Sequence, residues 1–436
     1  MKLRMSHLAA CLLSLLLVRG FAHDVRPLPA ANDELVGHFR LALDAVFGIG
    51  IRLQAFLQEK EKNFLVSPIS AAVIIGELIL GAEGDFRKEL VELLSLPNSH
   101  LYENDKIHHY HKDKNRTYDL PYSTLHIQLS NLLKALENSD RKNFVLKETS
   151  ALFVNNRVSL KDEYINNWAS KNTNGLINTI LAQPPRADTA SIFANAIYFL
   201  AEWEVPFSNI LNRRGPFEVN PTKQVEVTYM VGLLEQILYA ETDSYRIIAL
   251  PYKNEELGMY IILPKPDNAN KYDLKTFVQV LKYSDVLGSV SKARRRDVVV
   301  KIPKMSVSSS FSILEQLKKY RVYRRQNIQP NSTAGNALDK LEEKVDAFSN
   351  FTTDDQRDIF LTNAAVQRGL RIDDIVQQVV VTVNEKGTEA AAVSASTIDY
   401  MGGSKNFVVD RPFVFFIRHE ATSATLFWGA ISNPAD

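Results

Sequence analysis

The chain contains the residue types that carry out enzymatic chemistry, but they do not stand at the spacings of known catalytic motifs. It holds no G-x-S-x-G, no H-E-x-x-H, no phosphate-binding loop and no C-x-x-C. His419 lacks a partner histidine four residues on, and Gly48-Ile-Gly50 lacks the third glycine of a dinucleotide loop. We therefore expect no catalytic residues, although scattered Ser, His and Asp could still meet in space as the triad of a hydrolase.

Metal and thiol chemistry are equally poorly supported. The only cysteine, Cys11, lies in an N-terminal segment that we expect to be removed, so the mature chain should hold neither a thiol nor a disulfide. His108, His109 and His111 cluster in a polar stretch without a predicted helix to orient them. We expect no metal and no cofactor.

The N-terminus has the composition of a secretory signal peptide. Lys2 and Arg4 precede an apolar run that ends at Val18, and small residues follow up to Ala22. Residues 1–22 should be cleaved off, and no later stretch reaches the roughly 20 apolar residues of a membrane helix. We expect a secreted, extracellular protein that can carry glycans at three sequons: Asn115, Asn331 and Asn350.

The formal net charge of +1 gives no general attraction to nucleic acid or to a membrane. Basic residues do gather locally at Lys292–Arg296 and Lys318–Arg325. Solvated charge is the favoured interpretation of both runs, and a site for an acidic polysaccharide is the alternative.

Apolar periodicity predicts a single α+β domain over residues 23–436, without a linker or an internal repeat. Helices are expected at Glu34–Glu59, Ala71–Leu80, Asp85–Leu94 and Ser310–Tyr320. Strands are expected at Ala190–Phe199, Gln224–Tyr229, Tyr245–Pro251, Gly258–Leu263, Asp297–Ile302 and Ile375–Val383.

The segment Asn384–Phe413 follows a β-forming run but does not end in a tight turn, which marks a functional loop. From Thr388 onward the even positions are small or uncharged, whereas Glu389 and Asp399 fall on odd positions. Such alternation allows a strand with one face buried, and no proline interrupts Gly387–Gly403. A flexible linker of small residues is the alternative.

Motifs spread over most of the chain, in this order, resemble those of the serpins. They are Asn63–Ser70, Gly81–Gly84, Asn195–Phe199 with Trp203 and Pro206-Phe207, Leu250–Tyr252, Leu263-Pro264, Ile302–Lys304 and Phe407–Ile417. The resemblance implies a serpin fold with three β-sheets, about eight or nine helices, and an exposed reactive-centre loop at about 385–406.

For function, the resemblance implies a serine protease inhibitor. The protease attacks the loop as a substrate and forms an acyl-enzyme, and the cut loop then inserts as a new strand of the large sheet. The family's hinge positions match small or permissive residues here: Glu385, Gly387, Thr388, Ala390, Ala391 and Ala392. A non-inhibitory serpin that acts as a binding or carrier protein is the alternative.

The family spacing from the hinge glycine puts the reactive bond at Met401-Gly402. An apolar residue there favours an elastase-like or chymotrypsin-like target. Tyr400 is the next candidate if the register slips by one, and Lys405 would need an unusually long loop. The implied partner is an extracellular serine protease in a covalent complex with a monomeric inhibitor.

Two features depart from the family pattern. The polar cluster that closes the insertion gap, the shutter, matches Ser67, Ser70 and Asn195, but Gln377 replaces the usual histidine. Glutamine still donates and accepts hydrogen bonds but does not titrate. Near Ile165 about 20 residues of the family pattern are absent, which should remove a helix end and an edge strand.

Overall fold

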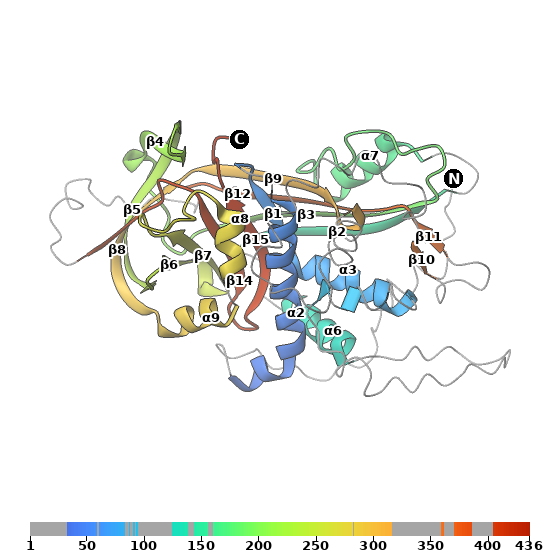
Figure 1. The fold of residues 1–436 in the computed structure, drawn as a ribbon, viewed down its shortest axis with the longest axis horizontal. Helices are drawn as coiled ribbons and strands as arrows, with labels where there is room; N and C mark the ends of the chain where they lie inside the picture. The colour runs from blue at the N-terminus through green and yellow to red at the C-terminus, as the bar shows by residue number, and fades with distance from the viewer. Residues whose placement is uncertain are drawn as a thin grey trace, which may run out of the picture.

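The computed structural model describes residues 33–58, 61–82, 87, 90–91, 93–94, 124–137, 144–155, 160–281, 283–315, 359–361, 370–385 and 404–436 (Figure 1). Its α-helices are α2 (Asp33–Leu57), α3 (Pro68–Gly81), α6 (Thr124–Glu137), α7 (Asp162–Asn172), α8 (Leu274–Val280) and α9 (Tyr283–Lys292). Among these helices, none combines the length and the apolar character needed to cross a bilayer.

In the part of the chain that the structure describes, the larger sheet has nine strands. Its order is β1-β15-β14-β7-β6-β5-β8-β13, and β4 pairs with β5 at one side. The strands are β1 (Phe64–Val66), β4 (Arg213–Asn220), β5 (Lys223–Glu241), β6 (Tyr245–Pro251), β7 (Leu257–Pro264), β8 (Arg294–Pro303), β13 (Lys405–Val408), β14 (Phe413–His419) and β15 (Ala424–Ile431). Every residue of β7 and β15 is buried, which explains why both read as continuous apolar runs.

The second sheet has, among the described residues, four strands in the order β2-β3-β12-β9. They are β2 (Phe144–Val154), β3 (Ser191–Ala201), β12 (Asp374–Val383) and β9 (Met305–Ser312). The central pair, β3 and β12, is parallel from Ile192 opposite Asp374 to Phe199 opposite Val381, and both outer pairs are antiparallel. A separate two-stranded sheet joins β10 (Ile359–Leu361) to β11 (Leu370–Ile372).

Alternate residues of β3 and β12 serve two cores on opposite faces of the four-stranded sheet. Phe193, Ile197 and Val379 face the main core, which includes residues of α2, α3 and α6. Ala194, Ala196 and Val376 face a smaller core closed by Ile165 and Ala169 of α7. Figure 1 shows the sheet edge-on between α7 on one side and α3 and α6 on the other.

The predicted α+β class is confirmed, and the predicted strands are present, several of them longer than expected. The helix predicted at Ser310–Tyr320 is wrong over its first three residues. Ser310–Ser312 belong to β9, where Phe311 lies opposite Gln377, and a helical turn begins only at Ile313. Strand pairing with the edge of β12 outweighs the helical preference that the local apolar pattern indicated.

Near Ile165, where the sequence lacks about 20 residues of the family pattern, α7 runs without interruption from Asp162 to Asn172. Ile165 and Ala169, one helical turn apart, are its buried residues, so the joined segment has a single apolar face. Among the described strands, β2 pairs only with β3 and lies at the edge of its sheet. This arrangement agrees with the loss of an edge strand.

Candidate functional site

β3 and β12 pair in parallel, and we call the boundary between these two strands the seam. A side-chain amide bridges the seam on the face of the sheet that points to the main core. Gln377 of β12 lies directly opposite Asn195 of β3, and both are fully buried. Gln377 Nε2 donates to Asn195 Oδ1 at 3.1 Å, and Gln377 Oε1 accepts from the backbone N–H of Ser67 at 3.1 Å. One uncharged side chain therefore ties the two strands to the start of α3.

The two serines extend this contact outwards. Ser67 Oγ donates to the carbonyl of Leu426 at 2.9 Å, and Ser70 Oγ donates to Glu148 Oε1 at 2.6 Å. The two hydroxyl oxygens lie 3.1 Å apart. The structure thus brings together the four residues matched to the shutter and connects them to β15 and β2.

Two members of this cluster were not predicted from the sequence, Glu148 and Ser150 of β2. Asn195 Nδ2 donates to Ser150 Oγ at 2.8 Å, and Glu148 accepts from Ser70. Both lie on even positions of β2, the same face as Leu146 and Leu152, which pack against the main core. The β-branched and aromatic residues at the two ends of β2 were the available signal, but the polar middle of this segment hid it, and β2 was not among the predicted strands.

At the far end of β12 an ion pair and a tryptophan hold the base of the loop. Glu385 Oε2 lies 2.9 Å from Lys304 Nζ, and its Oε1 accepts from Asn212 Nδ2 at 2.6 Å. Trp203 Nε1 donates to the carbonyl of Asn384 at 2.8 Å, and its indole stacks on Tyr252 with ring centroids 4.4 Å apart. The segment that leaves β12 is therefore anchored to the segment that leaves β3.

The Glu385 carboxyl is charged in this setting. Burial alone raises its pKa, but hydrogen bonds from Lys304, from its own backbone and from Asn212 outweigh burial and leave the pKa below the ordinary value of 4.5. Lys304 and Asn212 were not predicted as site residues. They are distant from Glu385 in sequence, so spacing gives no signal for them.

The direction of β3 and β12 determines how a further segment could pair with them. A chain that leaves β12 and folds back runs antiparallel to β12, and because β3 is parallel to β12 the same chain is antiparallel to β3 as well. A segment entering the seam can therefore form ladders on both of its edges. One parallel ladder would be exchanged for two antiparallel ones, which are slightly more stable per residue.

Several predicted residues lie outside the described part of the chain. They are residues 1–22, the histidines at 108, 109 and 111, the sequons Asn115, Asn331 and Asn350, the hinge residues Gly387, Thr388, Ala390, Ala391 and Ala392, and the bond Met401-Gly402. Glu385 is the one described hinge residue. β13 begins at Lys405, inside the range expected for the loop.

Within the described residues no group of three or more His, Cys, Asp or Glu side chains is placed to hold a metal ion.

Comparison with known proteins gives one consistent family. Iripin-3 of Ixodes ricinus is 28% identical over 403 residues, covering 88% of this chain and 93% of that protein. Intracellular coagulation inhibitor 1 of Tachypleus tridentatus is 27% identical, with 85% and 84% covered. Leukocyte elastase inhibitor of Bos taurus is 25% identical, with 90% and 99% covered.

A solved structure of uncleaved ovalbumin has the same fold. It matches with a TM-score of 0.63 at 19% identity and covers 90% of this chain and 99% of that one. A family model described as Serpin (serine protease inhibitor) matches residues 45–434, which is most of the sequence. The resemblance read from the motifs is thereby confirmed: the chain belongs to the serpin family.

Proposed function

We propose that this protein is a secreted inhibitor of a serine protease with an apolar primary pocket, and that it works by inserting its cut loop between β3 and β12. The observation that supports this most directly is the parallel pairing of these two strands. β12 ends at Val383 and the described hinge residue, Glu385, follows two residues later, so the loop begins at the end of this pair of strands.

The sequence of the loop is compatible with insertion between β3 and β12. Its even positions from Thr388 are small or uncharged, so they can pass between two existing strands without burying a charge. The names of the relatives from Bos taurus and Tachypleus tridentatus describe those proteins as inhibitors, which supports the same reaction type here.

Met401-Gly402 is the proposed reactive bond, with Tyr400 as the alternative one position upstream. An unbranched apolar side chain at the cleaved position fits the pocket of an elastase-like or chymotrypsin-like protease. The complex would be a covalent acyl-enzyme between the carbonyl carbon of Met401 and the protease serine, with Gly402 as the leaving amine.

The test is incubation of the full chain with elastase and with chymotrypsin. We expect a complex that survives SDS and a released C-terminal fragment that begins at Gly402. The control is Ala390→Arg, which puts a charge on the face that must be buried. This variant should be cut at the same bond but should form little complex, because insertion is slowed and the acyl-enzyme hydrolyses.

Thermal stability separates the alternatives. Insertion should raise the Tm of the cleaved protein far beyond the few degrees that one favourable substitution gives. Clean cleavage without a complex and without a rise in Tm would contradict inhibition and favour a binding or carrier role. Turnover of ester or peptide substrates without consumption of the chain would instead indicate a hydrolase.

Secretion and glycosylation rest on the sequence alone and form part of the proposal. Expression in cultured animal cells should release a protein that begins at His23. Digestion with an N-glycosidase should lower its apparent mass, and Asn→Gln variants at 115, 331 and 350 should show which sequons are occupied. Retention of the chain inside the cells with residues 1–22 still attached would contradict secretion.

A further inference from the structure

β2 lies at the edge of the four-stranded sheet, and no strand among the described residues pairs with its outer side. Its register against β3 runs without a bulge from Phe144 opposite Ala201 to Val154 opposite Ser191. The strand is 11 residues long and contains no proline. Short strands, bulges and prolines commonly keep a sheet edge from pairing with another chain, and β2 has none of these three features.

The hydrogen bonds of β2 show which of its backbone groups face outward. Asn155, directly after the strand, donates its N–H to the carbonyl of Ala190 at 2.8 Å. Bonded and non-bonded pairs alternate along an antiparallel ladder, so the odd residues of β2 bond to β3. The even residues from 144 to 154 therefore direct their N–H and C=O groups away from β3, to the open edge.

The residue types of β2 are nearly symmetric about Thr149. Apolar residues stand at 144–146 and at 151–154, and polar residues stand between them. A second, antiparallel copy of the strand centred on Thr149 would place similar residues opposite one another, and each of these even pairs could exchange two backbone hydrogen bonds. The opposed pairs are Leu146 with Leu152, Phe144 with Val154, and Glu148 with Ser150.

Charge favours this register over the two that differ from it by two residues. One of them puts Glu148 opposite Glu148 of the other copy, where like charges repel, and the other puts it opposite Leu152. In the centred register Glu148 meets Ser150, whose hydroxyl accepts from Asn195 Nδ2 and can still donate. A carboxylate accepts several hydrogen bonds, so this contact is compatible with the bond from Ser70.

An exposed aromatic side chain extends the surface on the α7 side of the sheet. Tyr164 of α7 packs edge-to-face on Phe153 of β2 with ring centroids 6.0 Å apart, and it is 56% exposed. Tyrosine is enriched in the buried parts of protein interfaces. Tyr164 thus adds apolar area beside a strand whose backbone can pair.

We propose that two copies of this chain associate through β2, in antiparallel pairing about a two-fold axis at Thr149. A two-fold interface requires a surface that is complementary to itself, and the symmetric strand meets this requirement. The four-stranded sheet of one copy then continues into that of the other. The second copy occupies the place of the edge strand that the sequence lacks near Ile165, so the protein is a dimer instead of the monomer that the family resemblance implies.

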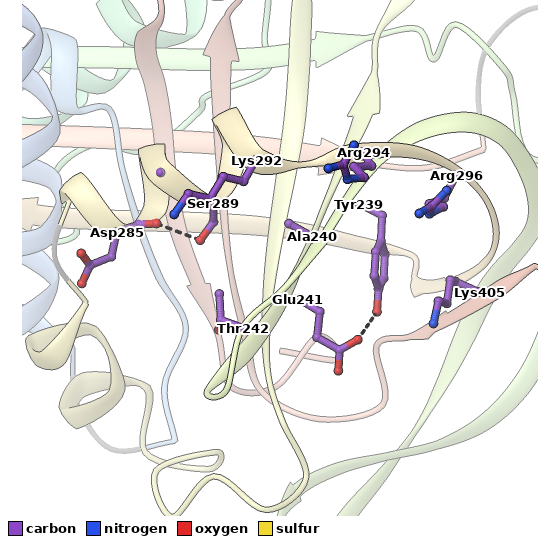
Figure 2. Close-up of a pocket in the computed structure, with 11 residues that line it drawn as sticks. Tyr239, Ala240, Glu241, Thr242, Asp285, Ser289, Lys292, Arg294, Arg296 and Lys405 are labelled. Carbon is purple, nitrogen blue, oxygen red and sulfur yellow. Dashed lines mark hydrogen bonds between the residues drawn. The ribbon is translucent and has the colours of Figure 1, made fainter.

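This pairing is independent of the parts of the molecule that serve inhibition. Insertion between β3 and β12 leaves the ladder between β2 and β3 intact, so cleaved and uncleaved protein should dimerise alike. The edge is also separate from a cavity of about 620 Å³ between α9 and the ends of β5, β8 and β13. None of the residues that line this cavity belongs to β2 or α7 (Figure 2).

The first test is sedimentation velocity of the intact full chain over a series of concentrations. We expect a species of twice the mass of one chain, whose share falls on dilution. Thr149→Lys puts like charges directly opposite each other at the axis, so it should weaken dimerisation by about tenfold or more. The matched control is Thr222→Lys, the same substitution at an exposed residue between β4 and β5, which should leave the dimer unchanged. Both variants should melt as the wild type does.

The second test examines the register by disulfide trapping in a chain that also carries Cys11→Ser, which removes its only natural thiol. In the dimer the two Thr149 residues form a non-hydrogen-bonded pair with Cα atoms about 4.5 Å apart, within the range of a disulfide. Thr149→Cys should therefore cross-link under mild oxidation. Ala151→Cys, on the same face, is the control and should not, because its two copies would lie more than about 10 Å apart.

Three results would overturn the proposal. Sedimentation as a monomer at every concentration would show that no second copy covers β2, and equal cross-linking of the two cysteine variants would show contact without the stated register. Loss of the dimer in Ala390→Arg but not in Thr149→Lys would show exchange of loops between copies. None of these outcomes depends on whether a complex with a protease forms, so the two proposals fail independently.

Discussion

Lys304 Nζ lies 2.9 Å from Glu385 Oε2, which places an ion pair two residues after the end of β12. The glutamate is almost completely buried and the lysine is half exposed. The pair therefore joins the base of the loop to the turn between β8 and β9. Any movement of the loop into the seam has to begin beside it.

Replacing Lys304 by Met should weaken this anchor. Because Lys304 is half exposed, the loss is about 0.5 to 1 kcal/mol, equivalent to a Tm lower by about 1 to 3 °C. Lys253→Met, which breaks the exposed pair with Glu202 at 3.1 Å, is the control and should have a smaller effect. Differential scanning fluorimetry of the uncleaved proteins measures both.

The same pair predicts a pH dependence. The pKa of Glu385 is lowered in the fold, so its contribution is fully present above 4.5 and is lost as the pH falls below that value. The Tm difference between wild type and Lys304→Met should therefore shrink in acid. A difference that stays constant down to pH 3 would contradict the ion pair.

Gln377→His should give the shutter a pH response that the natural chain lacks. A neutral imidazole can accept the N–H of Ser67, but a protonated imidazole has no acceptor atom left. The variant should lose stability, by about 1 to 3 kcal/mol, as the pH falls through the ordinary histidine range near 6.5. Urea denaturation at pH 8 and pH 5.5 tests this.

Gln378→His is the control for that experiment. Gln378 sits one residue on, is also buried, and donates to Ser308 Oγ at 2.7 Å instead of contacting the shutter. A charged imidazole can still donate to Ser308, so its change with pH should be smaller. An equal response from both variants would show that burial alone, and not the contact with Ser67, is responsible.

Glu148→Ala should destabilise the uncleaved protein by about 1 kcal/mol, because Ser70 Oγ loses its carboxylate acceptor at 2.6 Å and keeps only the Ser67 hydroxyl at 3.1 Å. Glu148→Gln should recover most of this loss, since an amide oxygen also accepts. The measurement is the urea midpoint of each variant. If the alanine variant matched wild type, Glu148 would be a surface residue without a part in closing the shutter.

His419 predicts a second loss of stability in acid, in a different part of the molecule. It is buried in β14 with Nδ1 2.8 Å from Thr422 Oγ1, and burial lowers its pKa from 6.5 to about 4. The unfolded chain takes up a proton between these values, so stability should fall by up to about 3 kcal/mol as the pH drops through that window.

His419→Asn, which keeps a polar group near Thr422 but does not titrate, should show a flatter curve of unfolding free energy against pH. Urea denaturation at pH 7.5 and pH 4.5 measures the slope. Identical slopes for variant and wild type would contradict the assignment of this loss to His419.

Sequence patterns predicted those parts of the fold in which burial follows a regular period. β6 matches its predicted bounds, Tyr245–Pro251, because its residues alternate between two packed faces. The start of β8 at Arg294 could not be predicted, since three successive arginines carry no apolar period. The N-terminal end of β8 forms a strand because β5 pairs with it, and Tyr239 lies opposite Arg294.

The candidate site likewise contains residues that the sequence predicted and residues that it did not. Ser67, Ser70, Asn195 and Gln377 followed from family motifs, and the structure places them in contact. Glu148, Asn212 and Lys304 act through contacts across 70 residues or more, from strands or turns whose neighbours are set only by the complete topology. No local pattern encodes such pairs.

The small core beneath α7 packs mainly on β2 and β3, so it divides the four-stranded sheet into two unequal parts. Most of its members belong to β2, β3 and the α7 region, whereas β12 contributes chiefly Val376. If a strand entered the seam, β12 would move away by about 5 Å. The helix would stay with β2 and β3 while β12 and β9 separated as a second unit, so amide exchange in α7 should hardly register the event.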